Sequence, residues 1–399
     1  MALALAGGGP LGAVYEIGAI TALSEALDGL DFNDMDVYVG VSAGAFITAG
    51  LANGLTPGQL CRMFIDGESA LVPFNPNRFL VPAYGEFWRR SSAVPGLLWD
   101  GFKDWMLGNR QGLLDAFTRL SRALPTGLFD NDAVARYLAE LFAAHGRGDD
   151  FRELNGRLFL VATNLDTGEA VAFGGDDTLD VPISKAIQAS AALPGLFPPV
   201  RINGQWFVDG ALKKTLHASV ALKEGAELVL CINPLVPFNA RRAAEQGKPN
   251  RAGLVEGGLT TVLSQTFRAI IHSRMEVGIA KYDLEYPNAD VILFEPDHGD
   301  TDLFFTNMFS YATRRQLCEH AYAQTRQALR DRLPMLGPQL ARHGVTIRTD
   351  VLDDPTRTLS RQLARLNRRR SGTLGQAVLK LDDTLDRLES ELRREAAAR

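Results

Sequence analysis

The sequence predicts an α/β sandwich built around a mainly parallel sheet. Segments with strand periodicity alternate with segments with helix periodicity from Ala2 to Asn233, as repeated strand and helix units require. The expected strands are the apolar runs around Leu3, Val37, Leu158–Ala162, Trp206, Leu228–Ile232 and Val291–Phe294. With 399 residues, of which 46% are hydrophobic and 22% charged, the chain can bury a large core and carry a smaller additional region.

A glycine-rich loop follows the first expected strand. Leu3–Ala6 leads into Gly7-Gly8-Gly9-Pro10-Leu11-Gly12, and the helical segment Val14–Leu27 comes next. Glycine suits any turn, but three in a row at the start of a helix also let backbone amides approach an anion closely. The candidate oxyanion-hole residues are Gly7, Gly8, Gly9 and Gly12.

The same loop offers an alternative reading as a dinucleotide site. Gly7, Gly9 and Gly12 satisfy the pattern G-x-G-x-x-G between a strand and a helix. That pattern also needs an acid roughly 20 residues further on, at the end of the second strand. Here the nearby acids precede the strand Val37–Val39, and this strand ends in a serine motif instead. We therefore disfavour nucleotide binding.

The serine motif is Gly40-Val41-Ser42-Ala43-Gly44. It stands between the strand Val37–Val39 and the small apolar segment Ala45–Leu51. Small residues on both sides of a serine allow the sharp strand-to-helix turn that exposes its Oγ at the start of a helix. Ser42 is therefore the candidate nucleophile, with Gly40 and Gly44 as its elbow glycines.

Asp209 is the candidate partner of Ser42. It ends the apolar run Gln205–Val208 and is followed by Gly210. An Asp-Gly pair by itself is a common turn signal. A carboxylate with an ordinary pKa near ~3.9 is also a weak base towards a hydroxyl, so the role requires partial desolvation and hydrogen-bond contact.

These segments resemble the patatin-like phospholipases over about residues 1–235. That family has a glycine-rich loop, a G-x-S-x-G elbow and a later D-G-[GA], here Asp209-Gly210-Ala211, and Ala189–Pro199 is similar to its serine and proline block. Leu11 departs from the basic residue that the family usually has in the glycine loop. The resemblance implies a three-layer α/β/α fold with a central, mainly parallel sheet.

The resemblance also implies a lipid acyl hydrolase with a Ser42–Asp209 dyad, an acyl-Ser42 intermediate and a phospholipid or related acyl ester as substrate. Neither a metal nor an organic cofactor is required. An acyltransferase with the same dyad, and a lipid-surface scaffold without catalysis, stay as alternatives. Chain order also leaves a triad open, with His298 in the loop after Val291–Phe294. The other five histidines show no metal-binding spacing.

The expected catalytic domain is 1–333, with an inserted lid region at 61–130. Three of the four tryptophans lie in that region, and its segment 74–105 is a candidate contact with a membrane, although packing within a helical subdomain explains the same aromatic residues. Residues 334–399 are expected to form a connector and an amphipathic helix.

The tail has two features of its own. Its heptad seam, 374–392, suits a homodimer, a return onto the catalytic domain or a membrane surface. The seam consists of Leu374, Val378, Leu381, Leu385, Leu388 and Leu392. Ahead of it, the basic segment 357–370 contains no acid, and from Thr356 onward 11 basic minus 6 acidic residues give +5. This segment is a solvated face or attracts anionic lipid. Nucleic acid is disfavoured because the rest of the chain is acidic and no recognition motif accompanies the arginines.

Cysteine usage and the absence of targeting signals favour a cytoplasmic chain, with peripheral membrane contact left open. The three cysteines, Cys61, Cys231 and Cys318, are far apart and odd in number, which favours free thiols. The sequence contains no secretory signal and no run of about 18 apolar residues.

Overall fold

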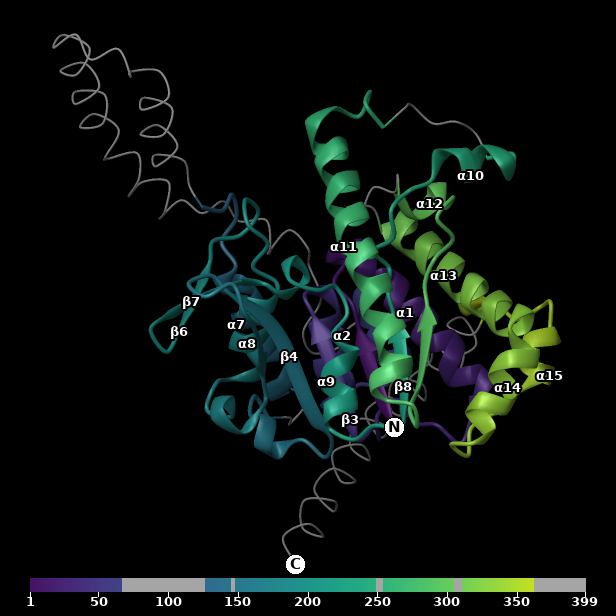
Figure 1. Ribbon diagram of the computed structural model, residues 1–399, viewed down its shortest axis with the longest axis horizontal. Coiled ribbons are helices and arrows are strands. Elements are labelled where there is room, and N and C mark those ends of the chain that lie inside the picture. The colour runs from purple at the N-terminus through teal and green to yellow at the C-terminus, as the bar shows by residue number, and fades with distance from the viewer. Residues whose placement is uncertain (67–125, 145–147, 249–253, 305–310, 362–399) are drawn as a thin grey trace, which may run out of the picture.

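The computed structural model describes residues 1–66, 126–144, 148–248, 254–304 and 311–361. At its centre is an eight-stranded sheet with the order β6-β7-β4-β3-β1-β8-β9, and β5 pairs with β4 (Figure 1). The strands are β1 (Ala2–Leu5), β3 (Val37–Val41), β4 (Arg157–Asn164), β5 (Ala170–Phe173), β6 (Val200–Ile202), β7 (Gln205–Asp209), β8 (Leu228–Ile232) and β9 (Asp290–Phe294). The pairs within β4-β3-β1-β8-β9 are parallel, whereas β5, β6 and β7 pair in antiparallel fashion. The predicted sheet and strand positions are confirmed.

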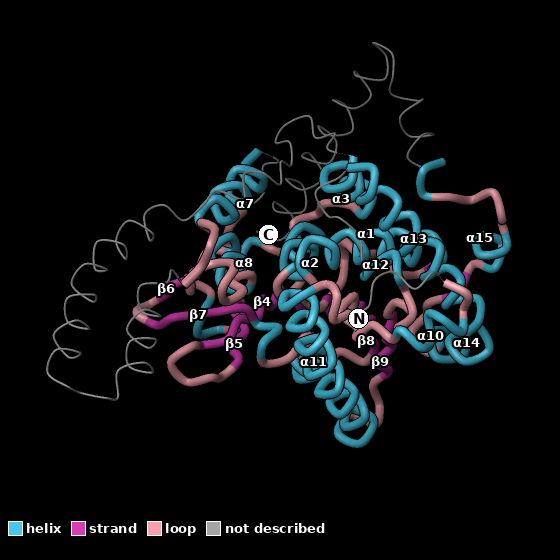
Figure 2. Tube along the Cα trace, turned by 90° about the horizontal axis from the view of Figure 1, so that it is seen from above, coloured by secondary structure: helices cyan, strands magenta, loops and turns pink. Residues whose placement is uncertain are grey.

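Helices cover both faces of the sheet, which confirms the three-layer α/β/α fold (Figure 2). One layer contains α1 (Gly9–Ala26), α2 (Ala43–Ala52), α7 (Asp132–Ala144), α8 (Ile183–Ser190) and α13 (Tyr311–Asp331), and the other contains α9 (Ala218–Lys223) and α11 (Gly258–Glu285). Because side chains alternate along a strand, Leu3 and Leu5 of β1 enter the first core, and Ala2 and Ala4 enter the second. Strands buried on both faces explain the nearly continuous apolar runs in the sequence.

Helices α1 and α13 pack closely against each other at Gly18. A Cβ atom at Gly18 would lie 2.4 Å from the carbonyl oxygen of Cys318. This position therefore needs glycine, and the contact joins the start of the chain to a helix 300 residues later. Cys318, Cys61 and Cys231 are buried free thiols, as predicted.

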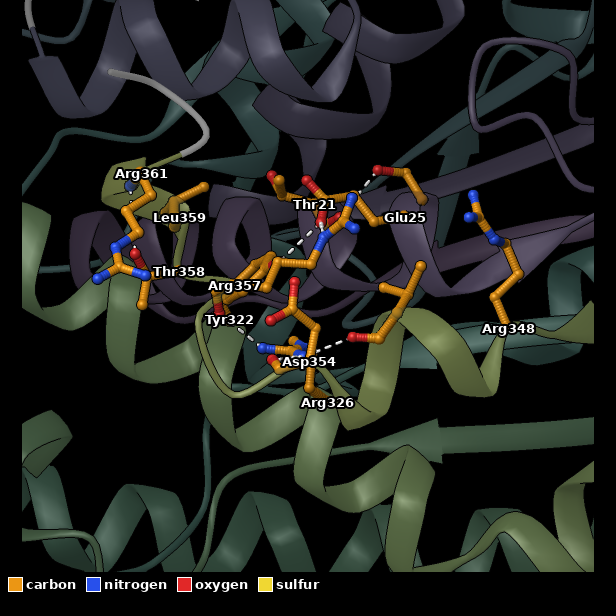
Figure 3. A network of polar contacts seen from close by, with 12 residues as sticks. Thr21, Glu25, Tyr322, Arg326, Arg348, Asp354, Arg357, Thr358, Leu359 and Arg361 are labelled. Carbon is orange, nitrogen blue, oxygen red and sulfur yellow. Dashed lines mark hydrogen bonds and ion pairs between the residues drawn. The ribbon is translucent and has the colours of Figure 1, made fainter. Parts of the chain in front are cut away.

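Residues beyond 333 pack onto the N-terminal part of the molecule. They form α14 (Leu333–Ala341), β10 (Thr346–Ile347) and α15 (Thr349–Asp353), and β10 pairs with β2 (Leu27–Asp28). The guanidinium of Arg326 donates to the carbonyls of Val351 and Arg357, at 2.6 and 2.7 Å (Figure 3). Arg357 in turn bonds Glu25 of α1 at 2.7 Å, so one arginine of the basic segment 357–370 already has a structural partner. The domain boundary at 333 stays a prediction.

Most of the predicted lid region 61–130 and the heptad seam 374–392 lie outside the described residues, as does the candidate membrane segment 74–105. The structure also contains three short helices, α3 (Pro57–Cys61), α10 (Ala240–Glu245) and α12 (Thr301–Phe304). Within the described ranges, no helix has both the length and the apolar character needed to cross a membrane.

Candidate active site

Ser42 lies in a strained turn between β3 and α2. Its φ of 52° and ψ of −116° are unusual for a residue other than glycine, and its main chain turns directly from strand to helix. A Cβ atom at Gly40 would lie 2.1 Å from Thr48 Oγ1, and one at Gly44 would lie 2.7 Å from the carbonyl oxygen of Ala6. The turn therefore depends on glycine at both positions that the sequence motif supplies.

The sheet brings Asp209 to Ser42 along one edge of β4. Strand β3 pairs with β4 up to Val161, and β7 pairs with β4 from the next residue, Ala162. Strand β5 pairs with residues 160–163 of β4, a range that overlaps the partners of both β3 and β7, so β5 occupies the opposite edge of β4. Strands β3 and β7 therefore meet end to end on the same edge. Their ends carry the two side chains, and Ser42 Oγ donates a hydrogen bond of 2.7 Å to Asp209 Oδ2.

The surroundings of Asp209 change its acidity. Only 2% of this residue is exposed, and burial raises the pKa of its carboxyl from 3.8 to about 6. The hydrogen bonds from the Ser42 hydroxyl and from the Ala211 amide, 2.8 Å from Oδ1, favour the ionised form and limit the rise. The result is a carboxylate that is more basic than usual but still ionised at neutral pH.

Ser190 is a residue whose position the sequence did not predict. Its Oγ accepts a hydrogen bond of 2.8 Å from the amide of Ser42 and donates one of 2.6 Å to the carbonyl of Val161. The hydroxyl thus ties the serine turn to the strand that also pairs with Asp209. Ser190 belongs to the serine and proline block Ala189–Pro199, which was the only signal for it in the sequence.

The glycine loop lies directly against the Ser42 side chain. A Cβ atom at Gly7 would be 3.2 Å from Ser42 Cβ and 3.9 Å from Ser42 Oγ. The Gly7 amide donates to the carbonyl of Thr215 at 3.3 Å, and the Gly12 amide donates to that of Gly8 at 3.1 Å. Within the described part of the chain, the amides of Gly8 and Gly9 donate no hydrogen bond, and they stand at the start of α1.

His298 does not join this arrangement. Its ring packs against that of His272, with 4.8 Å between centroids, and its Nε2 lies 3.7 Å from Glu295 Oε1. Among the described residues, no histidine hydrogen-bonds Ser42 or Asp209. The structure thus brings together the two residues of the predicted dyad and leaves the alternative triad without contact to it.

Two groups of side chains away from the dyad have atoms close enough to hold a cation. Their donor atoms lie within 4.8 Å of one another, and the groups are His272, Glu295 and His298, and Asp300, Asp302 and His320. In the second group, His320 and Asp300 already form an ion pair at 2.7 Å. Neither group includes Ser42 or Asp209.

The fold and the serine turn define an α/β protein of the kind that carries an ester-hydrolase site at the end of a central strand. The family model for patatin-like phospholipase matches residues 3–222. The chain belongs to the patatin-like phospholipase family.

Individual relatives are distant. An uncharacterized protein, R571, of Acanthamoeba polyphaga mimivirus is 22% identical over 223 residues, which cover 55% of this chain and 60% of the viral protein. The crystal structures of VipD from Legionella pneumophila and of the type III effector ExoU each match with 16% identity over 83% of this chain. Their TM-scores are 0.40 and 0.36, and the match covers 66% and 53% of those chains. The chain thus spans only about half to two thirds of these relatives.

Proposed function

We propose that this protein hydrolyses the acyl ester of a phospholipid, lysophospholipid or related lipid through an acyl-Ser42 intermediate. The observation that carries the proposal is the 2.7 Å hydrogen bond from Ser42 Oγ to a buried carboxylate whose pKa is raised to about 6. Family membership supports the lipid substrate class. A nucleophile and a base within hydrogen-bond distance are the minimum that this chemistry requires.

In the first step, Ser42 Oγ attacks the ester carbonyl carbon while Asp209 accepts the hydroxyl proton. The tetrahedral intermediate then collapses. Its bond to the alcohol oxygen breaks, Asp209 returns the proton to that oxygen, and the acyl group stays on Ser42. In the second step, Asp209 takes a proton from water, which attacks the acyl-enzyme, and the fatty acid leaves as Ser42 recovers its proton.

The negative charge on the carbonyl oxygen needs donors in both steps. The Gly8 and Gly9 amides suit this role because they have no partner within the described part of the chain and begin helix α1, where the helix dipole favours an anion. Gly7 and Gly12 contribute differently, since their amides already bond Thr215 and Gly8. They shape the loop that presents the other two.

The test is release of fatty acid from mixed phospholipid vesicles by the wild-type protein and by a His298→Ala variant. We expect both to release fatty acid at rates within about threefold of each other, because His298 does not contact the dyad. A folded His298→Ala variant without activity would contradict the dyad. An inert wild type would favour the scaffold, and transfer of the acyl group to an added alcohol in preference to water would favour the acyltransferase.

Helix α11 provides a candidate contact with the lipid surface. Its 28 residues span about 42 Å, whereas the five residues of β8 span about 17 Å. Because α11 returns the chain to the start of β9, the excess length projects beyond the carboxyl ends of the parallel strands, the end that carries Ser42 (Figure 1). Its first ten residues, 258–267, contain no charge.

This projecting part of α11 exposes an apolar stripe. The stripe consists of Leu259, Val262, Leu263, Phe267 and Ile270, which are 73, 39, 46, 52 and 52% exposed. Their spacing places them along one side of the helix. An exposed apolar stripe of this size is unusual for a surface that contacts only water. We infer that the stripe enters the outer part of the lipid layer that holds the substrate.

We expect the double substitution Leu259→Gln and Phe267→Gln to reduce binding to phospholipid vesicles at least tenfold, because it removes two apolar side chains that the lipid would bury. Sedimentation with vesicles measures this directly. Hydrolysis of a soluble short-chain ester should stay unchanged. Val277→Gln is the matched control, since Val277 is 59% exposed but lies on the part of α11 beside the sheet. Equal losses in both variants would contradict the assignment.

A further inference from the structure

A cavity lies away from the dyad, between the layer of α9 and α11 and the β4–β5 side of the sheet. Its volume is about 600 Å³, within the usual range for small-molecule sites. Phe159 of β4 lines the cavity. It lies two residues before Val161, whose carbonyl accepts the hydrogen bond from Ser190 near the dyad. The charged and titratable residues that line it are Lys213, Lys214, His217, Lys223, Glu224 and Arg274.

The cavity carries an excess of positive charge. None of its four cations, Lys213, Lys214, Lys223 and Arg274, forms an ion pair in the part of the chain that the structure describes. The single carboxylate, Glu224, is already paired with Arg157 outside the group of lining residues. Four unpaired cations around one cavity repel one another, and this is unexpected in a chain with a net charge of −5. A bound anion would remove that repulsion.

The lysines also hold geometries that leave them donor capacity. Lys213 Nζ donates to the carbonyl of Gly168 at 2.8 Å, and Lys214 Nζ donates to Tyr282 Oη at 3.1 Å and to Ser219 Oγ at 3.4 Å. Each ammonium group has three donors, so neither is saturated by neutral acceptors of this kind. The positions of both side chains are thus fixed by the protein while their charge stays uncompensated.

His217 adds a second polar anomaly in the same wall. It is only 6% exposed, and its Nε2 is buried with no hydrogen-bond partner. Burial, together with the nearby Lys214, lowers the pKa of His217 to about 4, so the ring is neutral near pH 7. A neutral imidazole nitrogen accepts a hydrogen bond from a protonated oxygen, which a phosphate monoester can supply.

The wall of this cavity is continuous with the active site. The segment from Asp209 to His217 starts at the proposed base, passes through Lys213 and Lys214, and includes Thr215, whose carbonyl accepts the Gly7 amide. A ligand that contacts the two lysines therefore contacts the segment that fixes both Asp209 and the glycine loop. Differential binding to one arrangement of this segment would change the activity of the dyad.

We propose that this cavity binds a phosphate-bearing anion and that the bound anion alters hydrolysis through the segment 209–217. Lysine and arginine are the side chains that most often bind phosphate groups in proteins, and the cavity is larger than a single phosphate. The part of the proposal that concerns hydrolysis rests on the proposed function, whereas binding does not. The phosphate group is either a soluble phosphate compound or the headgroup of a lipid.

The first experiment measures binding in the Ser42→Ala background, so that its result is independent of turnover. Pyrophosphate, followed by calorimetry, is the soluble probe, and vesicles of phosphatidylcholine with or without phosphatidic acid are the lipid probe. We expect saturable binding of at least one probe, and at least a tenfold weakening by Lys223→Gln together with Arg274→Gln. Both side chains are exposed and make no contact with the dyad, so the variant should fold.

The matched control replaces two exposed cations outside the cavity, Arg241→Gln together with Lys281→Gln. Pocket-dependent binding of phosphatidic acid vesicles alone identifies a lipid headgroup as the source, and pyrophosphate binding identifies a soluble one. Failure of both probes to bind, or an equal loss in the control, would overturn the site. In active protein, we expect a bound probe to change hydrolysis at least twofold, and binding without any change would overturn the effect on hydrolysis while leaving the site.

Discussion

Replacement of Ser42 by alanine is expected to lower phospholipid hydrolysis at least a thousandfold. The substitution removes one oxygen atom and with it the nucleophile, and only binding and the oxyanion donors then assist attack by water. Ser42 is buried, with 8% exposure, and the loss of a single oxygen atom leaves only a small space there, so the variant should fold. The measurement is fatty-acid release from vesicles, together with labelling by a fluorophosphonate that reacts with activated serines.

Two results would give this prediction a clear outcome. The wild type should incorporate one fluorophosphonate group, and mass spectrometry of the peptide should place it on Ser42. Ser190→Ala serves as the control, because Ser190 is a nearby buried hydroxyl that binds the Ser42 amide rather than Asp209. That variant should be slower but should still be labelled. Retention of more than a tenth of the wild-type activity by Ser42→Ala would rule out the acyl-Ser42 intermediate.

Replacement of Asp209 by asparagine is expected to lower hydrolysis at least a hundredfold at pH 8, since an amide has nearly the same shape but cannot accept the proton. In the wild type, the base must be ionised, and burial raises its pKa to about 6. The rate should therefore rise with pH up to about 6 and level off above it. Single-turnover acylation across pH 4.5–8.5 measures this profile. A rate that is independent of pH across this range would contradict the role of Asp209.

Although Asp209→Asn should lower hydrolysis, we do not expect it to lower the free energy of unfolding at pH 8. The pKa of Asp209 is higher in the folded protein than the 3.8 of an ordinary aspartate, so folding favours the protonated form. The contribution of this group to stability is fully present below pH 3.8 and is lost as the pH rises through about 6. Above that pH, the lost stability amounts to about 3 kcal/mol. Asp209→Asn avoids that cost. Denaturant unfolding at pH 8 should show a variant no less stable than the wild type, with the advantage shrinking towards pH 4.5.

Sequence reasoning succeeded where a feature depends on neighbouring residues. The serine turn requires Gly40 because a Cβ atom there would collide with Thr48 and Ala45, which lie within eight residues of it, whereas the collision at Gly44 is with Ala6, directly after the distant strand β1. The strands were recognisable because a sheet buried on both faces demands continuous apolar runs. Four ordered motifs also indicated the family that the comparison showed.

The sequence did not show how distant segments meet. Nothing near Ser190 indicated that its hydroxyl would bind the Ser42 amide, since the two residues are 148 positions apart. Loop position alone made His298 a candidate for a triad, and the structure instead places its ring against His272. The unpaired cations of the cavity lined by α9 and α11 come from one loop and two helices, and only packing brings them together.

By itself, the sequence determined the strand order along the chain, the serine turn and the glycine loop, because steric limits and local periodicity fix these features within short segments. The Asp-Gly motif predicted Asp209 as the partner of Ser42, but only the tertiary structure decided how the two side chains come within hydrogen-bond distance. Asp209 lies 167 residues away and reaches Ser42 because β3 and β7 end against consecutive residues of β4. Burial at that junction then raises the pKa of Asp209, and burial is a property of the packed molecule rather than of any short segment.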